Sequence, residues 1–303
     1  MGNDISKDNV RLSVITSCFK GEMYLRSFIN QLKQQSFSSE LVWILVHNEP
    51  SQVEMDIVRE FSEQHPGKIR HIIRNPVEPI SASWNRGWNT AETEYVCFWN
   101  LDDCRLYNSL QRQVETLERN PDCVMSYGDY MVVPEYGSTI GKRVKTNSYN
   151  TFIFQRKFPG GAFMVWRRNA LDRLGYFDEQ LQIACDYDLV TRAAVSRLRM
   201  CKTPGLIGYF TNESKGLSTI IGENKEVIER TVVQIRYGMF DKVIQENLLV
   251  SEKYRISGIL VGDNWLPIEI FVENYASFIK RRLFLQKFVR VRRLFMKLLK
   301  GTR

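Results

Sequence analysis

The sequence predicts an α/β fold with a mostly parallel central sheet, followed by a helical tail. Over the first hundred residues, short apolar runs alternate with segments of helical periodicity, which is the pattern of strand–helix–strand units. The chain of 303 residues is 44% hydrophobic and 12% aromatic. It therefore has enough apolar side chains for a large core and does not have the composition of a disordered chain.

The strands expected in the first third are Leu12 to Thr16, Leu41 to Val46, Ile69 to Ile73 and Tyr95 to Trp99. The helices expected between them are Glu22 to Gln35, Gln52 to Glu63 and Ser81 to Thr90. Right-handed crossovers make such strands parallel, and ligands bind at the carboxyl ends of parallel strands. We therefore expect one crevice, lined by Ser17 to Lys20, His47 to Ser51 and Asn100 to Cys104.

The middle of the chain has a different pattern, without an internal repeat. We expect a helix over 108–119, a strand over 124–133, an irregular polar stretch over 134–159, a strand over 162–166 and helices over 168–174 and 186–196. Trp84 and Trp88 are four residues apart, and Trp99 lies in an apolar run, so we expect all three to pack in the core.

The six cysteines contain no C-x-x-C pair, and the first residues lack the features of a secretory signal. We therefore expect free thiols in a reducing cytoplasm. Zinc is disfavoured, because the three histidines form no ligand-spaced cluster with the cysteines. No window reaches the roughly 18 apolar residues needed to span a bilayer, so membrane contact is expected to be peripheral.

The excess positive charge lies at the end of the chain. The formal net charge is +8, and residues 278–303 carry ten basic residues and no acidic one, with apolar residues near one face of a helix. We expect a basic amphipathic helix over 278–300 that binds an anionic membrane surface. The alternative is a helix that closes the hydrophobic core. Nucleic acid is not expected, because no recognition motif accompanies the basic run.

Two acidic clusters are candidates for chemistry. Asn100-Leu101-Asp102-Asp103 follows an apolar strand, and its carboxylates suit Mg²⁺ or Mn²⁺ bound together with phosphate oxygens. Asp186-Tyr187-Asp188 precedes a helix, where a carboxylate can act as a general base. The alternatives are helix caps at either cluster and an i,i+4 ion pair between Asp188 and Arg192.

Three segments in this order resemble the family 2 inverting glycosyltransferases of the GT-A fold, of the bacterial cell-surface polysaccharide type. They are SVITSCFKGEMYLRSFINQL, ASWNRGWNTAETEYVCFWNLDD and GGAFMVWRRNALDRLGYFDEQLQIACDYDLVTRAA. The resemblance covers roughly Leu12 to Ser218 and implies a Rossmann-like domain that binds a nucleotide-sugar.

The resemblance also implies roles for individual residues. Those implied for donor binding are Ser17, Phe19, Asn48, Asn85, Asn100, Asp102 and Gly161. Asp102 matches the second aspartate of the family's Asp-x-Asp metal motif, and Asp103 matches a common extra acid beside it. Asp186 matches the catalytic base, and Arg192 matches the arginine that usually follows it. The loop within Tyr209 to Thr219 often covers the diphosphate in the family.

This sequence departs from the family pattern at three positions. Asn100 replaces the first acid of the Asp-x-Asp metal motif, Asn48 replaces the aspartate that reads the base, and Cys185 stands where an acid often precedes the catalytic base. These departures put the donor's identity in doubt. They leave open a non-catalytic, membrane-associated protein that binds a nucleotide or glycan on a degenerate fold. A nucleotidyltransferase ranks below both, because Ser17 to Glu22 is not a glycine-rich basic loop.

The expected activity is the inverting transfer of a sugar from a nucleoside-diphosphate sugar to a hydroxyl acceptor. A UDP-sugar is the favoured donor, a divalent cation (Mn²⁺ or Mg²⁺) the cofactor, and a glycan or polyprenyl-linked molecule the acceptor. We expect the catalytic domain over 8–220 and a helical extension over 221–303. The protein is expected to be cytoplasmic and peripheral on the inner face of the membrane.

Overall fold

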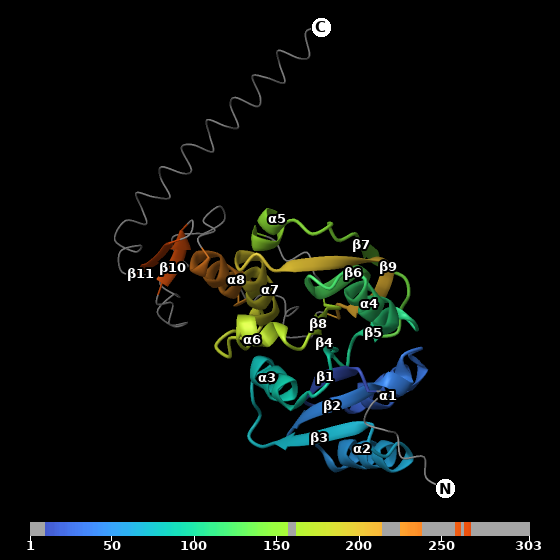
Figure 1. The fold of residues 1–303 in the computed structure, drawn as a ribbon. Helices are drawn as coiled ribbons and strands as arrows, with labels where there is room; N and C mark the ends of the chain where they lie inside the picture. Colours follow the sequence, from blue (N-terminus) through green and yellow to red (C-terminus); the bar gives the residue numbers. More distant parts are fainter. Residues whose placement is uncertain (1–9, 157–161, 214–224, 238–257, 262–263, 268–303) are drawn as a thin grey trace. The chain divides into compact units, whose positions relative to one another are not determined.

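The computed structural model describes residues 10–156, 162–213, 225–237, 258–261 and 264–267 (Figure 1). The chain forms two compact units, Met1–Glu223 and Asn224–Arg303. In the second unit, helix α8 (Lys225–Arg236) precedes an antiparallel pair, β10 (Gly258–Val261) and β11 (Asn264–Pro267). The basic helix expected over 278–300 lies outside the described residues. None of the described helices is both long and apolar enough to cross a membrane.

The first unit contains nine strands and seven α-helices in its described residues. The strands are β1 (Leu12–Cys18), β2 (Leu41–Asn48), β3 (Ile69–Arg74), β4 (Tyr95–Phe98), β5 (Cys104–Arg105), β6 (Cys123–Val133), β7 (Lys142–Val144), β8 (Val165–Arg167) and β9 (Arg199–Thr211). The helices are α1 (Glu22–Gln34), α2 (Gln52–Gln64), α3 (Ile80–Thr90), α4 (Ser109–Glu118), α5 (Thr151–Arg156), α6 (Ala170–Leu174) and α7 (Cys185–Val195), and a short 3-10 helix covers Ser38–Glu40.

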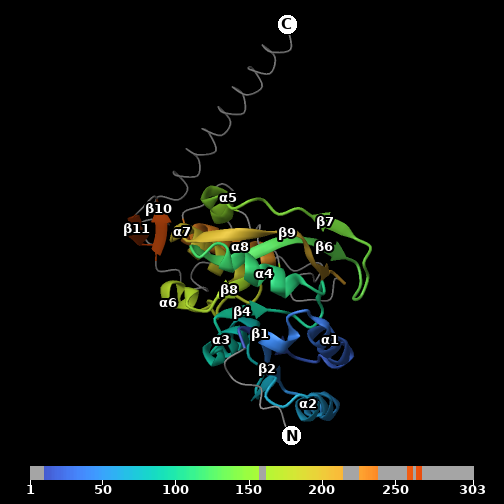
Figure 2. The ribbon, with the colours of Figure 1, turned by 45° about the vertical axis from the view of Figure 1, so that its right-hand side comes forward.

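One mixed sheet carries these strands in the order β3-β2-β1-β4-β8-β6-β9-β5, with β7 paired to β6. The first four strands are parallel, as are β6 and β9, whereas β8, β5 and β7 run antiparallel to their neighbours. Figure 2 shows β6 and β9 side by side, with α4 next to them. The predicted α/β fold with a mostly parallel sheet is therefore confirmed.

The parallel part of the sheet is covered on both faces. Leu12, Val14 and Cys18 of β1 belong to one core cluster with residues of α1 and α2. Ile15 points to the opposite face and packs so closely against Gly87 of α3 that a Cβ atom at Gly87 would clash with it. Because side chains alternate along a strand, Ser17 and Cys18 at the end of β1 lie on opposite faces of the sheet.

Most boundaries in the first hundred residues agree with prediction to within two residues, because the apolar runs of β1, β2 and β4 are almost entirely buried. The polar stretch 134–159 was expected to be irregular but contains β7 and α5. The strand expected over 162–166 is the shorter β8, and the strands β5 and β9 were not foreseen over 104–105 and 199–208. Each of these strands depends on partners far away in the sequence, which local periodicity cannot reveal.

The tryptophan prediction is confirmed, since Trp84, Trp88 and Trp99 are at most 7% exposed. The prediction that all six cysteines are free is wrong, because Cys123 and Cys201 form a disulfide. Their strands, β6 and β9, are parallel neighbours, and this contact spans 78 residues of sequence. Cysteine spacing therefore does not support the inference of a reducing compartment.

Candidate active site

The predicted site residues of the first half of the chain lie at one end of the sheet. Strands β2, β1 and β4 are parallel neighbours, so the residues at their carboxyl ends share one edge. Ser17 lies near the end of β1, Asn48 ends β2, and Asn100 follows β4. This agrees with the expectation that the three segments meet.

Asn48 is 1% exposed, and its side chain forms hydrogen bonds with residues from three segments. Its amide nitrogen donates to Ser83 Oγ at 3.1 Å and lies 3.4 Å from Ser17 Oγ, and its carbonyl oxygen accepts from the Glu78 backbone N–H at 3.0 Å. An amide can donate and accept in this way, whereas an aspartate at the same position can only accept. Asn48 therefore fixes Ser17 relative to the start of α3.

Helix α3 also holds the segment that leads to α7. The Asn85 side chain is buried and accepts from the Phe177 N–H at 2.8 Å. Its amide nitrogen donates to the Phe177 carbonyl at 3.0 Å and to Glu179 Oε1 at 2.9 Å. Asn85 thus connects helix α3, which also carries the Asn48 partner Ser83, to the loop before Asp186.

The acidic loop after β4 presents two carboxylates in different environments. Asp103 is 2% exposed and accepts from the Thr211 N–H at 3.1 Å, so it attaches the loop to the end of β9. Burial raises the pKa of Asp103, and so does the charge of Asp102. Asp102 is only partly buried, and burial together with the nearby Glu213 charge raises its pKa.

Glu213 is a further acidic residue that the sequence did not single out. Its carboxylate accepts from the Tyr136 N–H at 2.9 Å and from the Tyr24 hydroxyl at 3.4 Å. Its charge acts on both Tyr24 and Asp102. Two carboxylates close enough for the charge of one to raise the pKa of the other favour a bound cation. The only sequence signal was the position of Glu213 just after the family's final strand.

At the start of α7, the two acids of the second cluster have different surroundings. Asp188 is fully buried and pairs with Arg192, whose guanidinium also donates to the carbonyls of Leu174 and Tyr176. The i,i+4 alternative for this pair is therefore confirmed. Asp186 is only partly buried and lies in the first turn of the helix, so Asp188 has a structural role and Asp186 is the candidate base.

Two remaining donor-binding candidates differ in what can be said of them. Phe19 is 46% exposed, and the Lys20 ammonium lies 5.1 Å from the centre of its ring. An exposed aromatic ring at the carboxyl end of β1 offers a surface for stacking a base. Gly161 lies outside the described residues, as does the loop over 214–219.

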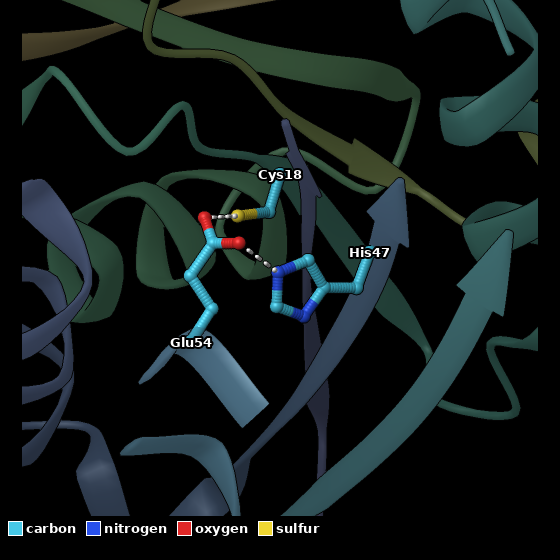
Figure 3. Close-up of side chains that lie close together, drawn as sticks. All are labelled: Cys18, His47 and Glu54. Carbon is cyan, nitrogen blue, oxygen red and sulfur yellow. Dashed lines mark hydrogen bonds and ion pairs between the residues drawn. The ribbon is translucent and has the colours of Figure 1, made fainter. Parts of the chain in front are cut away.

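A separate cluster joins Cys18, His47 and Glu54, whose potential ligand atoms all lie within 4.8 Å of one another (Figure 3). All three side chains are at most 2% exposed. The expectation that no histidine and cysteine lie together with ligand spacing is therefore wrong. Sequence reasoning missed the cluster because its members come from β1, β2 and α2 and form no linear pattern.

The chain is similar to known proteins in both sequence and structure. The model of glycosyl transferase family 2 matches residues 13–179, which is more than half of the chain. Among curated proteins, no significant match is found. The strongest evidence at the sequence level is therefore the family model.

Several solved structures share the fold. S. aureus TarS 1-349 in complex with UDP has a TM-score of 0.59 at 17% identity, over 79% of this chain and 66% of that one. Its complex with UDP-GlcNAc has a TM-score of 0.60 at 17% identity, over 79% and 67%. The mannosyltransferase PcManGT from Pyrobaculum calidifontis, in complex with GDP-Man and Mn²⁺, has a TM-score of 0.52 at 14% identity, over 80% and 64%.

These likenesses show that the first unit has the GT-A fold. The chain spans 66% of TarS 1-349 in its UDP complex and 43% of the longer TarS chain that it also matches.

Proposed function

Since this chain belongs to glycosyl transferase family 2 and has the GT-A fold, we propose that it transfers a sugar from a nucleoside-diphosphate sugar to a hydroxyl acceptor with inversion. The observation that carries the proposal is the arrangement at the sheet edge. There, the Ser17 and Asn48 network and the partly buried Asp102 lie at the ends of adjacent parallel strands. Ligands bind at this edge in open α/β sheets.

The nucleoside would bind beside β1 and β2. Phe19 offers an exposed ring for the base, and Ser17 offers a hydroxyl whose position depends on Asn48. Because Asn48 is itself buried and bonded to Ser83 and Glu78, we assign its effect on base preference to the position of Ser17. Asn85 supports the donor site through the Phe177 loop, and Gly161 stays a prediction. A UDP-sugar is the favoured donor, as in one of the TarS complexes.

The residues around Asp102 fit a divalent cation, Mn²⁺ or Mg²⁺. Asp102 and Glu213 are carboxylates whose charges repel, and Asn100 supplies an amide oxygen, so hard oxygen ligands are available. Asp103 is buried and bonded to Thr211, and we assign it the role of holding this loop in place. When bound, the cation would neutralise the charge of the departing diphosphate.

Asp186 is the proposed general base. The acceptor oxygen forms a bond to the anomeric carbon while the bond from that carbon to the diphosphate oxygen breaks. The acceptor proton passes to the Asp186 carboxylate, and the nucleoside diphosphate leaves with the electron pair. Arg192 and Asp188 support this role by fixing the start of α7 against the carbonyls of Leu174 and Tyr176.

The acceptor, the domain limits and the location of the protein belong to the same proposal. We propose a glycan or polyprenyl-linked acceptor, a catalytic domain over 8–220 and an extension over 221–303 whose basic helix binds an anionic membrane surface from the cytoplasmic side. The ten basic residues of 278–303 support the membrane contact through their charge.

Thermal unfolding with a panel of uridine, guanosine and thymidine diphosphate sugars tests the proposal, with and without Mn²⁺. A donor present at 100 times its dissociation constant should stabilise the wild type by about 2.7 kcal/mol. The Mn²⁺-dependent part should be lost in Asp102→Ala. Stabilisation by a donor that never turns over would favour the alternative, a non-catalytic binding protein. Stabilisation by no donor at all would contradict both.

A further inference from the structure

Cys18, His47 and Glu54 form a closed cluster of three different metal-ligand types, which we refer to as the Cys–His–Glu cluster. Cys18 Sγ lies 3.9 Å from Glu54 Oε1, and His47 Nε2 lies 3.6 Å from Glu54 Oε2 (Figure 3). In a tetrahedral zinc site with bonds of about 2.0–2.3 Å, neighbouring ligand atoms are roughly 3.5 Å apart. Shifts of well under 1 Å would bring the two measured pairs to that spacing.

The backbone sets the cluster in place. Cys18 and His47 are paired directly across the parallel strands β1 and β2, so their side chains leave the sheet on the same face. Glu54 lies in the first turn of α2 on that face, as the third helical residue of a capping box with Ser51. Strands β1 and β2 and helix α2 thus place a sulfur, a nitrogen and an oxygen close together.

Cys18 Sγ donates a long hydrogen bond to Glu54 Oε1, but Glu54 and His47 keep ligand capacity that the protein's hydrogen bonds do not use. Glu54 accepts from the backbone N–H of Gly21 at 2.6 Å and of Ser51 at 2.7 Å, which leaves lone pairs on both carboxylate oxygens. His47 Nε2 is buried and makes no hydrogen bond. A buried carboxylate and an unpaired ring nitrogen are costly together, unless a cation or a proton lies between them.

The hydrogen bond of the other ring nitrogen of His47, Nδ1, orients the ring so that Nε2 can bind a metal. His47 Nδ1 lies 3.1 Å from His71 Nε2. At this distance the Nε2 of a neutral His71 imidazole can accept the hydrogen bond that His47 Nδ1–H donates. That tautomer leaves the Nε2 lone pair of His47 directed at the cluster. Metal-bound histidines commonly donate their second N–H in this way.

We propose that the Cys–His–Glu cluster is a zinc site, with Cys18 Sγ, His47 Nε2 and the Glu54 carboxylate as its protein ligands. Binding converts the Cys18 thiol and Zn²⁺ into a zinc thiolate and releases the thiol proton to solvent. The thiolate and the carboxylate together neutralise the two charges of the ion. Thiolate and imidazole ligands favour Zn²⁺ over Mg²⁺ or Mn²⁺.

This site is separate from the proposed Mn²⁺ or Mg²⁺ site at Asp102, which has only oxygen ligands. It also does not depend on the proposed function, because its metal content can be measured in a protein that has no activity. Zinc there would join the ends of β1 and β2, next to Ser17 and Asn48. It would therefore stabilise the loops on which the nucleoside is proposed to bind.

The first test is the metal content of the full chain, purified without a histidine tag and dialysed at pH 7.5. Elemental mass spectrometry should find about one zinc per chain in the wild type and in Asp102→Asn. It should find close to none in Cys18→Ser. Cys104→Ser is the matched control, because Cys104 is a partly buried free cysteine outside the cluster, and it should keep the zinc.

The second test uses Co²⁺ as the probe and needs no variant. Chelator-treated wild type should develop a thiolate-to-cobalt charge-transfer band that saturates at one equivalent and weakens as the pH falls, because protons compete for Cys18. Glu54→Gln keeps the capping-box acceptor and should lower Co²⁺ affinity, and His71→Gln should lower it by about 10–100-fold. Absence of the band in the wild type, or its persistence in Cys18→Ser, would overturn the proposal.

Discussion

Among the residues that the structure describes, two groups of potential metal ligands lie near the carboxyl ends of parallel strands, and they differ in ligand type and exposure. Asp102 and Glu213 offer only oxygens, and both are partly exposed. The Cys–His–Glu cluster offers sulfur, nitrogen and oxygen and is closed to solvent. A partly exposed oxygen site suits a hard cation that arrives with a diphosphate, whereas a buried mixed site suits an ion that stays with the protein.

The alternation of side chains along the strands produces this separation. Ser17 and Asn48 face the α3 side, where both meet the same network. Their chain neighbours Cys18 and His47 face the α2 side, where both meet Glu54. Changes at the open edge should therefore alter turnover or donor binding, and changes at the cluster should alter stability. The predictions below test this division.

The largest effect is expected at the open edge, for Asp186→Asn. Loss of the base should lower the transfer rate by about 10²–10⁴-fold, while the donor's dissociation constant stays within about twofold. Steady-state kinetics and calorimetric titration with the donor measure the two quantities. Asp122→Asn is the control, because Asp122 is an exposed carboxylate paired with Arg199. Transfer at the wild-type rate in Asp186→Asn would remove Asp186 from the mechanism.

At the closed cluster, Glu54→Ala should lower the free energy of unfolding by about 1–3 kcal/mol. The substitution leaves the Gly21 and Ser51 N–H groups without their acceptor and removes half of the capping box. Urea denaturation measures the change. Glu60→Ala, on the exposed face of the same helix, should change it by less than about 0.5 kcal/mol. Equal losses of unfolding free energy in both variants would show that the buried hydrogen bonds of Glu54 add no stability beyond that of an exposed glutamate.

Glu213→Gln should weaken Mn²⁺-dependent donor binding by about tenfold, which corresponds to roughly 1.4 kcal/mol. The amide keeps the hydrogen-bonding oxygen near Tyr136 but removes the charge that acts on Asp102. The measurement is the dependence of donor affinity on Mn²⁺ concentration. An unchanged dependence would mean that Glu213 serves only to position Tyr24 and Tyr136.

The smallest effect is a pH dependence of stability at His71. Its pKa is lowered to about 4 in the folded chain, compared with about 6.5 in the unfolded chain. The folded state therefore binds the proton less tightly than the unfolded state does. The stabilisation that results from neutral His71 is fully present above pH 6.5 and declines as the pH falls towards 4. When the pH falls from 7 to 5.5, the free energy of unfolding of His71→Gln should decrease by about 1 kcal/mol less than that of the wild type. Parallel pH profiles would contradict a partly buried, neutral His71.

The sequence predicted the first half of the fold well because β1, β2 and β4 are buried on both faces and therefore consist of mainly apolar runs. Ser17, Asn48 and Asp102 could be brought to one edge from that pattern alone. By contrast, Glu213 could not be assigned to Asp102, nor Cys123 to Cys201, because these contacts depend on how β6, β9 and β5 pair across long stretches of chain. The Cys–His–Glu cluster was missed for a different reason: its members come from β1, β2 and α2 and form no linear pattern, although these elements were themselves predicted.

The most direct test of the central claim is the release of nucleoside diphosphate by the wild type from uridine, guanosine and thymidine diphosphate sugars in Mn²⁺. Glycosyltransfer predicts that at least one donor releases its diphosphate, that a hydroxyl acceptor accelerates the release, and that Asp186→Asn abolishes the acceleration. Release from no donor, in a protein that a donor nevertheless stabilises, would contradict the catalytic account and identify a binding protein.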